Sequence, residues 1–130
     1  MKTPQSSPKR VLVVEDEPAI SQVCLRVLTN EGFEVDIAVN GKVAQEMIEE
    51  KQYDLCLIDI RTPEMDGKEL YQWLQKKHPE LTRGVIFTTG DVMGGGTQSF
   101  LEQVGRLFLP KPFTPGELKA VVREAVRRIT

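Results

Sequence analysis

Cysteine, long apolar runs and a surplus of charge of one sign are all scarce in this sequence, and each shortage excludes a class of protein. The two cysteines, Cys24 and Cys56, fit neither a metal site nor a disulfide framework, so we expect buried thiols in a reducing compartment. No apolar run approaches the roughly 20 residues that span a bilayer, which argues against membrane insertion of this segment. The 17 basic and 19 acidic residues lack the basic excess of a general nucleic-acid binder. We therefore expect a cytoplasmic protein without direct contact to nucleic acid.

What is present is the composition of an ordinary globular protein, with 40% apolar and 28% charged residues over 130 positions. This length suits one domain with one hydrophobic core. Residues 1–9 are rich in Pro and Ser and have no apolar segment after their basic residues, so they do not form a secretory signal. We expect residues 1–9 to be a disordered leader or an expression remnant, and residues 10–130 to form the domain.

Five short apolar segments have the length and character of β-strands. Segments 11–14 (VLVV) and 55–58 (LCLI) are unbroken, as expected of parallel strands that are buried on both faces. Segments 85–88 and 107–109 are the fourth and fifth expected strands. In segment 33–38 apolar residues alternate with polar ones, which indicates a strand with one drier face at an edge of the sheet.

A helical pattern of apolar residues follows each of these segments. The expected helices begin at Pro18, after Asn40, after Gly67, near Phe100 and after Thr114. The last is the clearest, because Thr114 and Glu117 can form a capping box and an apolar stripe continues to Ile129. Five alternating strand–helix pairs predict an α/β fold, in which a doubly wound parallel sheet carries helices on both faces.

Polar side chains follow four of the predicted strands. In a doubly wound parallel sheet the carboxyl ends of the strands share one edge, and ligands bind beyond that edge. The residues that follow the first, third, fourth and fifth strands are Glu15 and Asp16, Asp59, Thr88 and Thr89, and Lys111. The sequence therefore predicts a functional site at this edge of the sheet.

Three of these residues are carboxylates, Glu15, Asp16 and Asp59, and they crowd together if the first and third strands are neighbours. Adjacent strands lie about 4.8 Å apart. Two like charges about 4 Å apart repel each other by about 4 kcal/mol at an effective dielectric constant near 20. Such a cluster needs a cation, and all-oxygen ligands with room for water suit Mg²⁺.

Four segments of the chain carry a resemblance to a known family. VLVVEDEP, LCLIDIRTPEMDG, VIFTTGD and FLPKPF resemble the signature blocks of response-regulator receiver domains. They occur in the family's order and at its spacing, with 30 residues from Asp59 to Thr89 and 22 from Thr89 to Lys111. The resemblance covers roughly residues 10 to 129. It implies a flavodoxin-like, five-stranded parallel sheet in the order 2-1-3-4-5 with five helices.

The resemblance implies a role for several residues of the predicted site. Asp59 would accept a phosphoryl group from a phosphohistidine, Lys111 would contact first Asp59 and then a phosphoryl oxygen, and Thr89 would be the switch hydroxyl. Phe108 would fill the space that Thr89 vacates; many family members have Tyr there, and Phe keeps the ring without the hydroxyl. The affected face would be the fourth helix, fifth strand and fifth helix, and the Lys111–Pro112 peptide bond would be cis.

The resemblance also implies how the predicted Mg²⁺ is bound. Its protein ligands would be the carboxylates of Glu15, Asp16 and Asp59 and the backbone carbonyl of Arg61. Arg61 and Asp91 each lie two residues beyond a site residue, where family members tune the lifetime of the phosphoryl group by blocking or admitting water. Solvated loop charges are the alternative interpretation of these two side chains.

The implied function is that of a phosphoacceptor in a two-component phosphorelay. Such a domain catalyses its own Mg²⁺-dependent phosphorylation and slow dephosphorylation, and it does not turn over an external substrate. Its partner would be a histidine kinase or a histidine phosphotransfer protein. The stretch 89–113 resembles receivers at the C-terminal end of hybrid sensor histidine kinases, so we favour that origin over a stand-alone adapter. A weak homodimer through the fourth helix, fifth strand and fifth helix is a further expectation.

Two other functions compete with this interpretation. A flavodoxin-like binder of a small molecule would need a phosphate-binding loop rich in Ser, Thr and Gly after the first strand, whereas this chain has EDEP, which repels phosphate unless a metal intervenes. A protein-interaction module that works without phosphorylation is the second alternative. Retention of Glu15, Asp16, Asp59, Thr89 and Lys111 argues against it.

Overall fold

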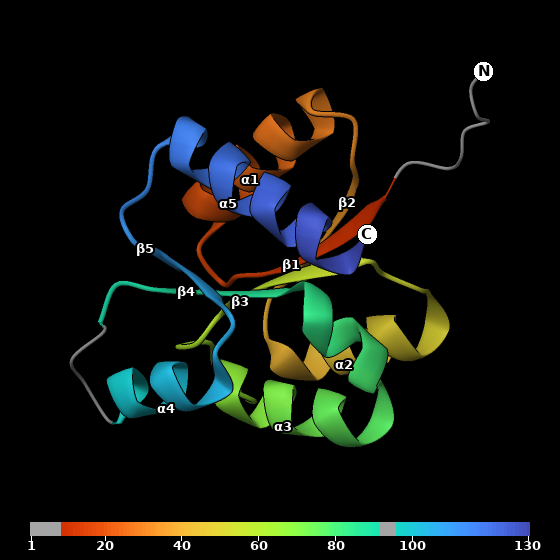
Figure 1. Cartoon of the computed structure of the whole chain (residues 1–130), viewed down its shortest axis with the longest axis vertical. Coiled ribbons are helices and arrows are strands. Elements are labelled where there is room, and N and C mark those ends of the chain that lie inside the picture. The colour runs from red at the N-terminus through yellow and green to blue at the C-terminus, as the bar shows by residue number, and fades with distance from the viewer. Residues whose placement is uncertain (1–8, 92–95) are drawn as a thin grey trace.

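A computed structural model of the chain describes residues 9–91 and 96–130, in which strands and helices alternate (Figure 1). The strands are β1 (Arg10–Val14), β2 (Glu34–Ala38), β3 (Leu55–Asp59), β4 (Val85–Thr89) and β5 (Leu107–Pro110). The α-helices are α1 (Pro18–Asn30), α2 (Gly41–Glu50), α3 (Gly67–Lys77), α4 (Thr97–Val104) and α5 (Pro115–Ile129). These ten elements are the five strands and five helices that the sequence predicted.

Three further observations concern the expectations about the chain as a whole. A short 3-10 helix, η1 (Pro79–Gly84), joins α3 to β4 and was not predicted. The predicted leader, residues 1–9, falls almost wholly outside the described residues and stays a prediction. Over the described ranges, no helix has both the length and the apolar character needed to cross a membrane.

The five strands form one parallel sheet in the order β2-β1-β3-β4-β5, which confirms the predicted flavodoxin-like topology. β2 lies at one edge of the sheet, as its alternating sequence indicated. β1 and β3 are neighbours, with Val13 opposite Leu57. The residues that follow β1 and β3 therefore meet at the carboxyl edge of the sheet.

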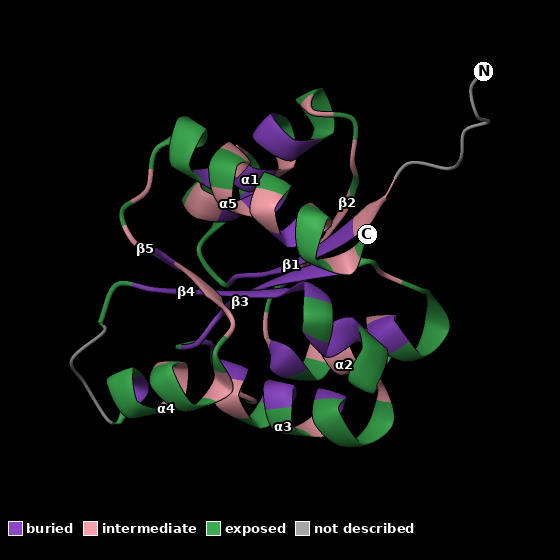
Figure 2. Ribbon diagram, viewed as in Figure 1, coloured by how far each residue is buried: buried purple, intermediate pink, exposed green. Residues whose placement is uncertain are grey.

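Two apolar clusters, one on each face of the sheet, hold the helices in place (Figures 1 and 2). α2, α3 and α4 cover one face, and α1 and α5 cover the other. Because side chains alternate along a strand, Leu12 joins the cluster on the side of α2, α3 and α4, and Val13 joins the cluster on the side of α1 and α5. Cys56 is a buried free thiol in the former cluster and Cys24 in the latter, which confirms that both are core side chains.

Side-chain caps fix where three of the helices begin. Thr114 and Glu117 form the predicted capping box of α5, and the side chain of Asn40 caps α2. Asp66 and Glu69 form a further capping box on α3 that was not predicted. Each cap pairs amide groups that a helix leaves unsatisfied, which stabilises the helix by about 1 kcal/mol. All three helices begin at the carboxyl edge of the sheet, so the caps also hold the loops around the candidate site.

Candidate functional site

Asp59 is the last residue of β3, and its side chain is buried at the carboxyl edge of the sheet. β3 is buried along its whole length, so it delivers this carboxylate to the interior of the edge. Asp59 Oδ1 accepts a hydrogen bond from the amide of Arg61 at 3.0 Å. The loop that follows returns very close to the strand, because a Cβ on Gly67 would lie 2.8 Å from the Cα of Ile60. Glycine at this position therefore keeps the loop tight beside Asp59.

Lys111 follows β5, and its ammonium group lies among carboxylates. Its amide donates to the carbonyl oxygen of Thr89 at 3.0 Å, and the peptide bond that follows it is cis, as expected. Its Nζ lies 2.8 Å from Asp59 Oδ2, 2.9 Å from Glu15 Oε1 and 3.2 Å from Glu17 Oε1. The side chain is only 11% exposed. One lysine from the fifth strand thus contacts carboxylates that come from the ends of the first and third.

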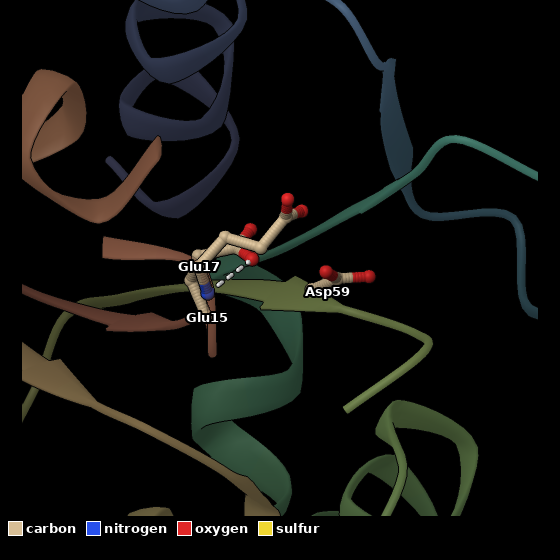
Figure 3. Close-up of side chains that lie close together, drawn as sticks. All are labelled: Glu15, Glu17 and Asp59. Carbon is tan, nitrogen blue, oxygen red and sulfur yellow. Dashed lines mark hydrogen bonds between the residues drawn. The ribbon is translucent and has the colours of Figure 1, made fainter. Parts of the chain in front are cut away.

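Glu15 and Glu17 belong to the loop between β1 and α1 (Figure 3). Glu15 is buried, and its amide donates to the carbonyl oxygen of Ala38 in β2 at 2.9 Å. The amide of Glu17 donates to Glu15 Oε2 at 3.1 Å, the contact drawn in Figure 3, and so orients that carboxylate. One oxygen from each of Glu15, Glu17 and Asp59 lies within 4.8 Å of the other two. These three residues are called the acidic cluster below.

The acidic cluster holds more negative charge than Lys111 neutralises. Burial raises the pKa of Glu15 to about 7 despite the nearby ammonium group, and the negative charge of Asp59 adds to this effect. Burial by itself lowers the pKa of Lys111, but its hydrogen bonds to Asp59 and Glu15 outweigh burial and hold the pKa above its ordinary value. Lys111 is therefore fully charged at neutral pH, while ionisation of Glu15 has a cost.

Asp16, predicted as one of the three crowded carboxylates, is exposed. It lines a pocket of about 340 Å³ together with Asp59 and Lys111. Among the described residues, the third carboxylate of the acidic cluster is supplied by Glu17, which the sequence analysis did not single out. The sequence feature that could have indicated Glu17 is that EDEP contains a third acidic residue. That signal was weak, because a glutamate in the loop before a helix is ordinarily solvated.

Arg61 and Asp91, predicted to tune the lifetime of a phosphoryl group, form an ion pair with each other. Arg61 Nη1 lies 2.6 Å from Asp91 Oδ2, and both side chains are more than half exposed. Both residues line the same pocket as Asp59. The pair therefore joins the loop after β3 to the loop after β4 at the pocket.

The predicted switch residues occupy the last two strands of the sheet. Thr89 is buried, lines the pocket, and accepts a hydrogen bond from the amide of Asp91 through Oγ1 at 3.2 Å. Phe108 is half-buried and packs against the apolar cluster on the side of α4. Thr88 is also buried, but its Oγ1 has no hydrogen-bond partner within the described part of the chain. A buried hydroxyl without a partner is an unfavourable feature that the sequence did not predict.

The residues at this edge have the donor chemistry of a magnesium site. Carboxylate and carbonyl oxygens are the hard ligands that Mg²⁺ prefers. Glu15 and Asp59 lie close together with little exposure, and the three carboxylates of the acidic cluster outnumber the one ammonium group that faces them. A divalent cation bound here would relieve that excess of negative charge, so the residues present fit the ion.

Comparison with known proteins finds relatives over nearly the whole chain. A family model described as response regulator receiver domain matches residues 11–123. The sensor kinase CckA of Brucella abortus (strain 2308) is 34% identical over 128 residues, which cover 97% of this chain and 13% of that protein. The chain thus spans only a small part of this longer relative.

Solved structures of similar proteins have the same fold. A response regulator receiver domain protein (CheY-like) from Methanospirillum hungatei JF-1 is 30% identical with a TM-score of 0.81, over 94% of this chain and 97% of that one. The receiver domain of the sensor histidine kinase PA1611 from Pseudomonas aeruginosa PAO1 is 26% identical with a TM-score of 0.80, over 92% of this chain and 98% of that one. That structure has a magnesium ion coordinated in its active-site cleft.

Proposed function

This chain belongs to the family of response regulator receiver domains, and we propose that it accepts a phosphoryl group on Asp59 and transmits the event as a change of conformation. The observation that carries the proposal is the position of Asp59. Its carboxylate is buried at the end of β3, lies 2.8 Å from Lys111 Nζ and faces a pocket of about 340 Å³. A nucleophile, a fixed positive charge and room for a small group are therefore together.

The proposed reaction is phosphoryl transfer from a phosphohistidine of a histidine kinase or a histidine phosphotransfer protein. An oxygen of Asp59 attacks phosphorus, the P–O bond of an acyl phosphate forms, the P–N bond breaks, and the imidazole leaves with the electron pair. Lys111 contacts a phosphoryl oxygen of the product, and the hydroxyl of Thr89 donates to another. Water later hydrolyses the acyl phosphate slowly, and the Arg61–Asp91 pair at the pocket governs its access.

Glu15, Asp16, Asp59 and the backbone carbonyl of Arg61 are the proposed ligands of Mg²⁺. Bound Mg²⁺ would supply positive charge that neutralises the phosphoryl oxygens and carboxylates during transfer. Asp16 is exposed and lines the pocket, and its position suits a ligand that remains in contact with water. Glu15 and Asp59 are the buried members of this proposed ligand set.

The proposed output is a shift of the face formed by α4, β5 and α5. Phosphorylation adds nearly two negative charges and strong hydrogen-bond acceptors beside Thr89. Thr89 moves toward them, and the ring of Phe108 takes up the vacated space. A change in population from 1:99 to 99:1 would require about 5.5 kcal/mol of differential stabilisation. Self-association through this face is the corresponding expectation for the oligomeric state.

The parent protein that we favour is a hybrid sensor histidine kinase, in which this domain would lie in the cytoplasm. The similarity to the sensor kinase CckA, of which the chain covers 13%, supports this choice. In such a protein the phosphoryl group would arrive from the kinase core or pass on to a histidine phosphotransfer protein.

Incubation with acetyl phosphate and Mg²⁺, followed by intact mass measurement, tests the proposed phosphorylation. We expect the wild type to gain one labile phosphoryl group and Asp59→Asn to gain none. The matched control is Asp54→Asn, which makes the same change just before the opposite end of β3 and should gain the group as the wild type does. A wild type that gains nothing, or an Asp59→Asn variant that gains as much, would contradict the proposed role of Asp59.

A further inference from the structure

The loop between β3 and α3 is closed by a side chain that has no part in the proposed reaction. Thr62 is buried, and its hydroxyl donates to the carbonyl oxygen of Met65 at 3.0 Å. The amide of Gly41, at the start of α2, donates to the same oxygen at 3.1 Å. The Met65 carbonyl group therefore fastens the loop twice, once across its own turn and once to the neighbouring helix.

The same loop has a backbone conformation that needs such support. Glu64 has a φ of 69°, in the left-handed region that residues other than glycine seldom adopt. A residue in this region stays there only where the surrounding contacts hold it. The hydrogen bond from Thr62 to Met65 spans Glu64 and is one of these contacts. It thus helps to keep the loop in a single conformation.

The peptide group between Arg61 and Thr62 lies between two fixed points. On its amino side, the amide of Arg61 donates to Asp59 Oδ1 at 3.0 Å. On its carboxyl side, Thr62 is fixed by its hydroxyl. The carbonyl group of Arg61 belongs to this peptide, and Arg61 lines the pocket that Asp16 and Asp59 also line. Without the Thr62 hydroxyl, the peptide would be held by a side-chain hydrogen bond on one side only.

The position of a carbonyl ligand matters more for Mg²⁺ than for Ca²⁺. Mg²⁺ requires a nearly octahedral set of oxygens at about 2.1 Å, whereas Ca²⁺ accepts a flexible set at roughly 2.3–2.6 Å. We propose that Thr62 is a positioning residue that fixes the Arg61 carbonyl and thereby makes the site select Mg²⁺ over Ca²⁺. The inference rests on the proposed function, because the Arg61 carbonyl is a ligand only in the set proposed there.

Two variants at position 62 separate the hydrogen bond from the volume of the side chain. Thr62→Val keeps the shape and removes the donor, whereas Thr62→Ser keeps the donor. In the valine variant the Met65 carbonyl oxygen still accepts from Gly41, so no buried acceptor is left unpaired and the variant should fold. The matched control is Thr82→Val, which removes a buried hydroxyl that donates to Pro79 at 2.6 Å in η1, before the amino end of β4.

The affinities of all four proteins for Mg²⁺ alone and for Ca²⁺ alone are measured by NMR titration of the amide signals of Asp59 and Arg61. Urea denaturation in EDTA records the stability of each protein. We expect Thr62→Val to bind Mg²⁺ about tenfold more weakly, the loss typical of a group that supports a metal ligand. Its affinity for Ca²⁺ should fall about threefold or less. Thr62→Ser and Thr82→Val should keep the wild-type ratio of the two affinities.

An equal loss of both affinities in Thr62→Val would overturn the inference, and so would a Thr62→Ser variant that behaves like Thr62→Val. A Thr62→Val variant that is less stable in EDTA but has the wild-type ratio would show that the hydroxyl only supports the fold. If the wild type is phosphorylated by acetyl phosphate while Thr62→Val keeps that ratio, the inference alone fails. A wild type that binds no Mg²⁺ refutes the proposed ligand set, and the inference with it.

Discussion

The two ends of the sheet carry the same kinds of charged side chain in opposite surroundings. At the amino end, Arg10 pairs with Glu34 at 3.2 Å and Lys51 pairs with Asp36 at 2.9 Å. These pairs are matched one to one, and their side chains are 33–52% exposed. Water screens such charges, so each pair contributes about 1 kcal/mol or less to the free energy of unfolding.

At the carboxyl end, by contrast, Lys111 faces the acidic cluster, and two of its three carboxylates are 5% exposed or less. Burial makes these charges interact strongly. One ammonium group cannot compensate the negative charge of three carboxylates. An exposed ion pair therefore adds little to the free energy of unfolding. A buried group of charges with excess negative charge lowers the free energy of unfolding and favours the binding of a cation.

Replacing the buried lysine should have the largest effect. We expect Lys111→Ala to lower the free energy of unfolding by about 3 kcal/mol in EDTA at pH 7, because it leaves Asp59 and Glu15 buried without a cation. Urea denaturation followed by circular dichroism measures the loss. Lys51→Ala, the matched change at the amino end, should cost less than about 1 kcal/mol. Equal losses from both variants would contradict the contrast between the two ends.

Neutralising one buried carboxylate should act in the opposite direction. Because the pKa of Glu15 is about 7 in the folded state and near 4.5 when unfolded, the folded protein binds more protons between these values. Stability linked to Glu15 is therefore present below pH 4.5 and is lost as pH rises through 7. Glu15→Gln should stabilise the metal-free protein by about 2 kcal/mol at pH 8 and by much less at pH 5.

Thermal unfolding of both proteins in EDTA at the two pH values checks this prediction. Mg²⁺ should then stabilise the wild type more than the Glu15→Gln variant, because the variant has lost one of the proposed ligands. A variant that is less stable than the wild type at pH 8 would show that the contact with Lys111 outweighs the cost of burial.

A smaller gain in stability is expected from removing the buried hydroxyl of Thr88. Its Oγ1 has no hydrogen-bond partner among residues 9–91 and 96–130, and valine has nearly the same shape without the polar atom. Thr88→Val should raise the free energy of unfolding by about 1 kcal/mol. Chemical denaturation measures the change, and Thr82→Val serves as the comparison, because the hydroxyl of Thr82 donates to Pro79 at 2.6 Å and its removal should destabilise.

The smallest effect should come from the exposed pair at the amino end. Glu34→Gln, which weakens the contact with Arg10, should change the free energy of unfolding by less than about 0.5 kcal/mol. The difference should shrink further in 1 M NaCl, where the screening length is about 3 Å. A change above about 1.5 kcal/mol that persists in salt would mean that the amino end is not the screened surface described above.

Much of the fold and the outline of the site followed from local sequence. The unbroken apolar segments 11–14 and 55–58 are strands that are buried on both faces, and burial of that kind leaves a direct trace in composition. The alternation in 33–38 placed β2 at an edge for the same reason. Asp59 and Lys111 could be predicted because each lies at the carboxyl end of an apolar strand segment, and the carboxyl ends of parallel strands lie at one edge of the sheet.

Other features depend on contacts between distant parts of the chain. Glu17, rather than Asp16, contacts Lys111, which is 94 residues away in sequence, and local sequence could not predict this contact. The 3-10 helix η1 has no helical period of its own and is held by the burial of Leu81. The residues of the α3 capping box, Asp66 and Glu69, have the spacing of this motif in the sequence. They follow a loop rich in turn residues, so the start of the helix could not be placed from the sequence.

The ammonium contacts of Lys111 also bear on how the chain folds. Four strands, β1, β3, β4 and β5, must be in register before Lys111 can contact Asp59 and Glu15, and the last of them is built from the final quarter of the sequence. Pairing of such distant segments is slow compared with the formation of local helices. A molecule whose fifth strand has not yet paired lacks the positive charge beside Asp59. The proposed phosphoryl-accepting site is therefore complete only when the sheet is complete.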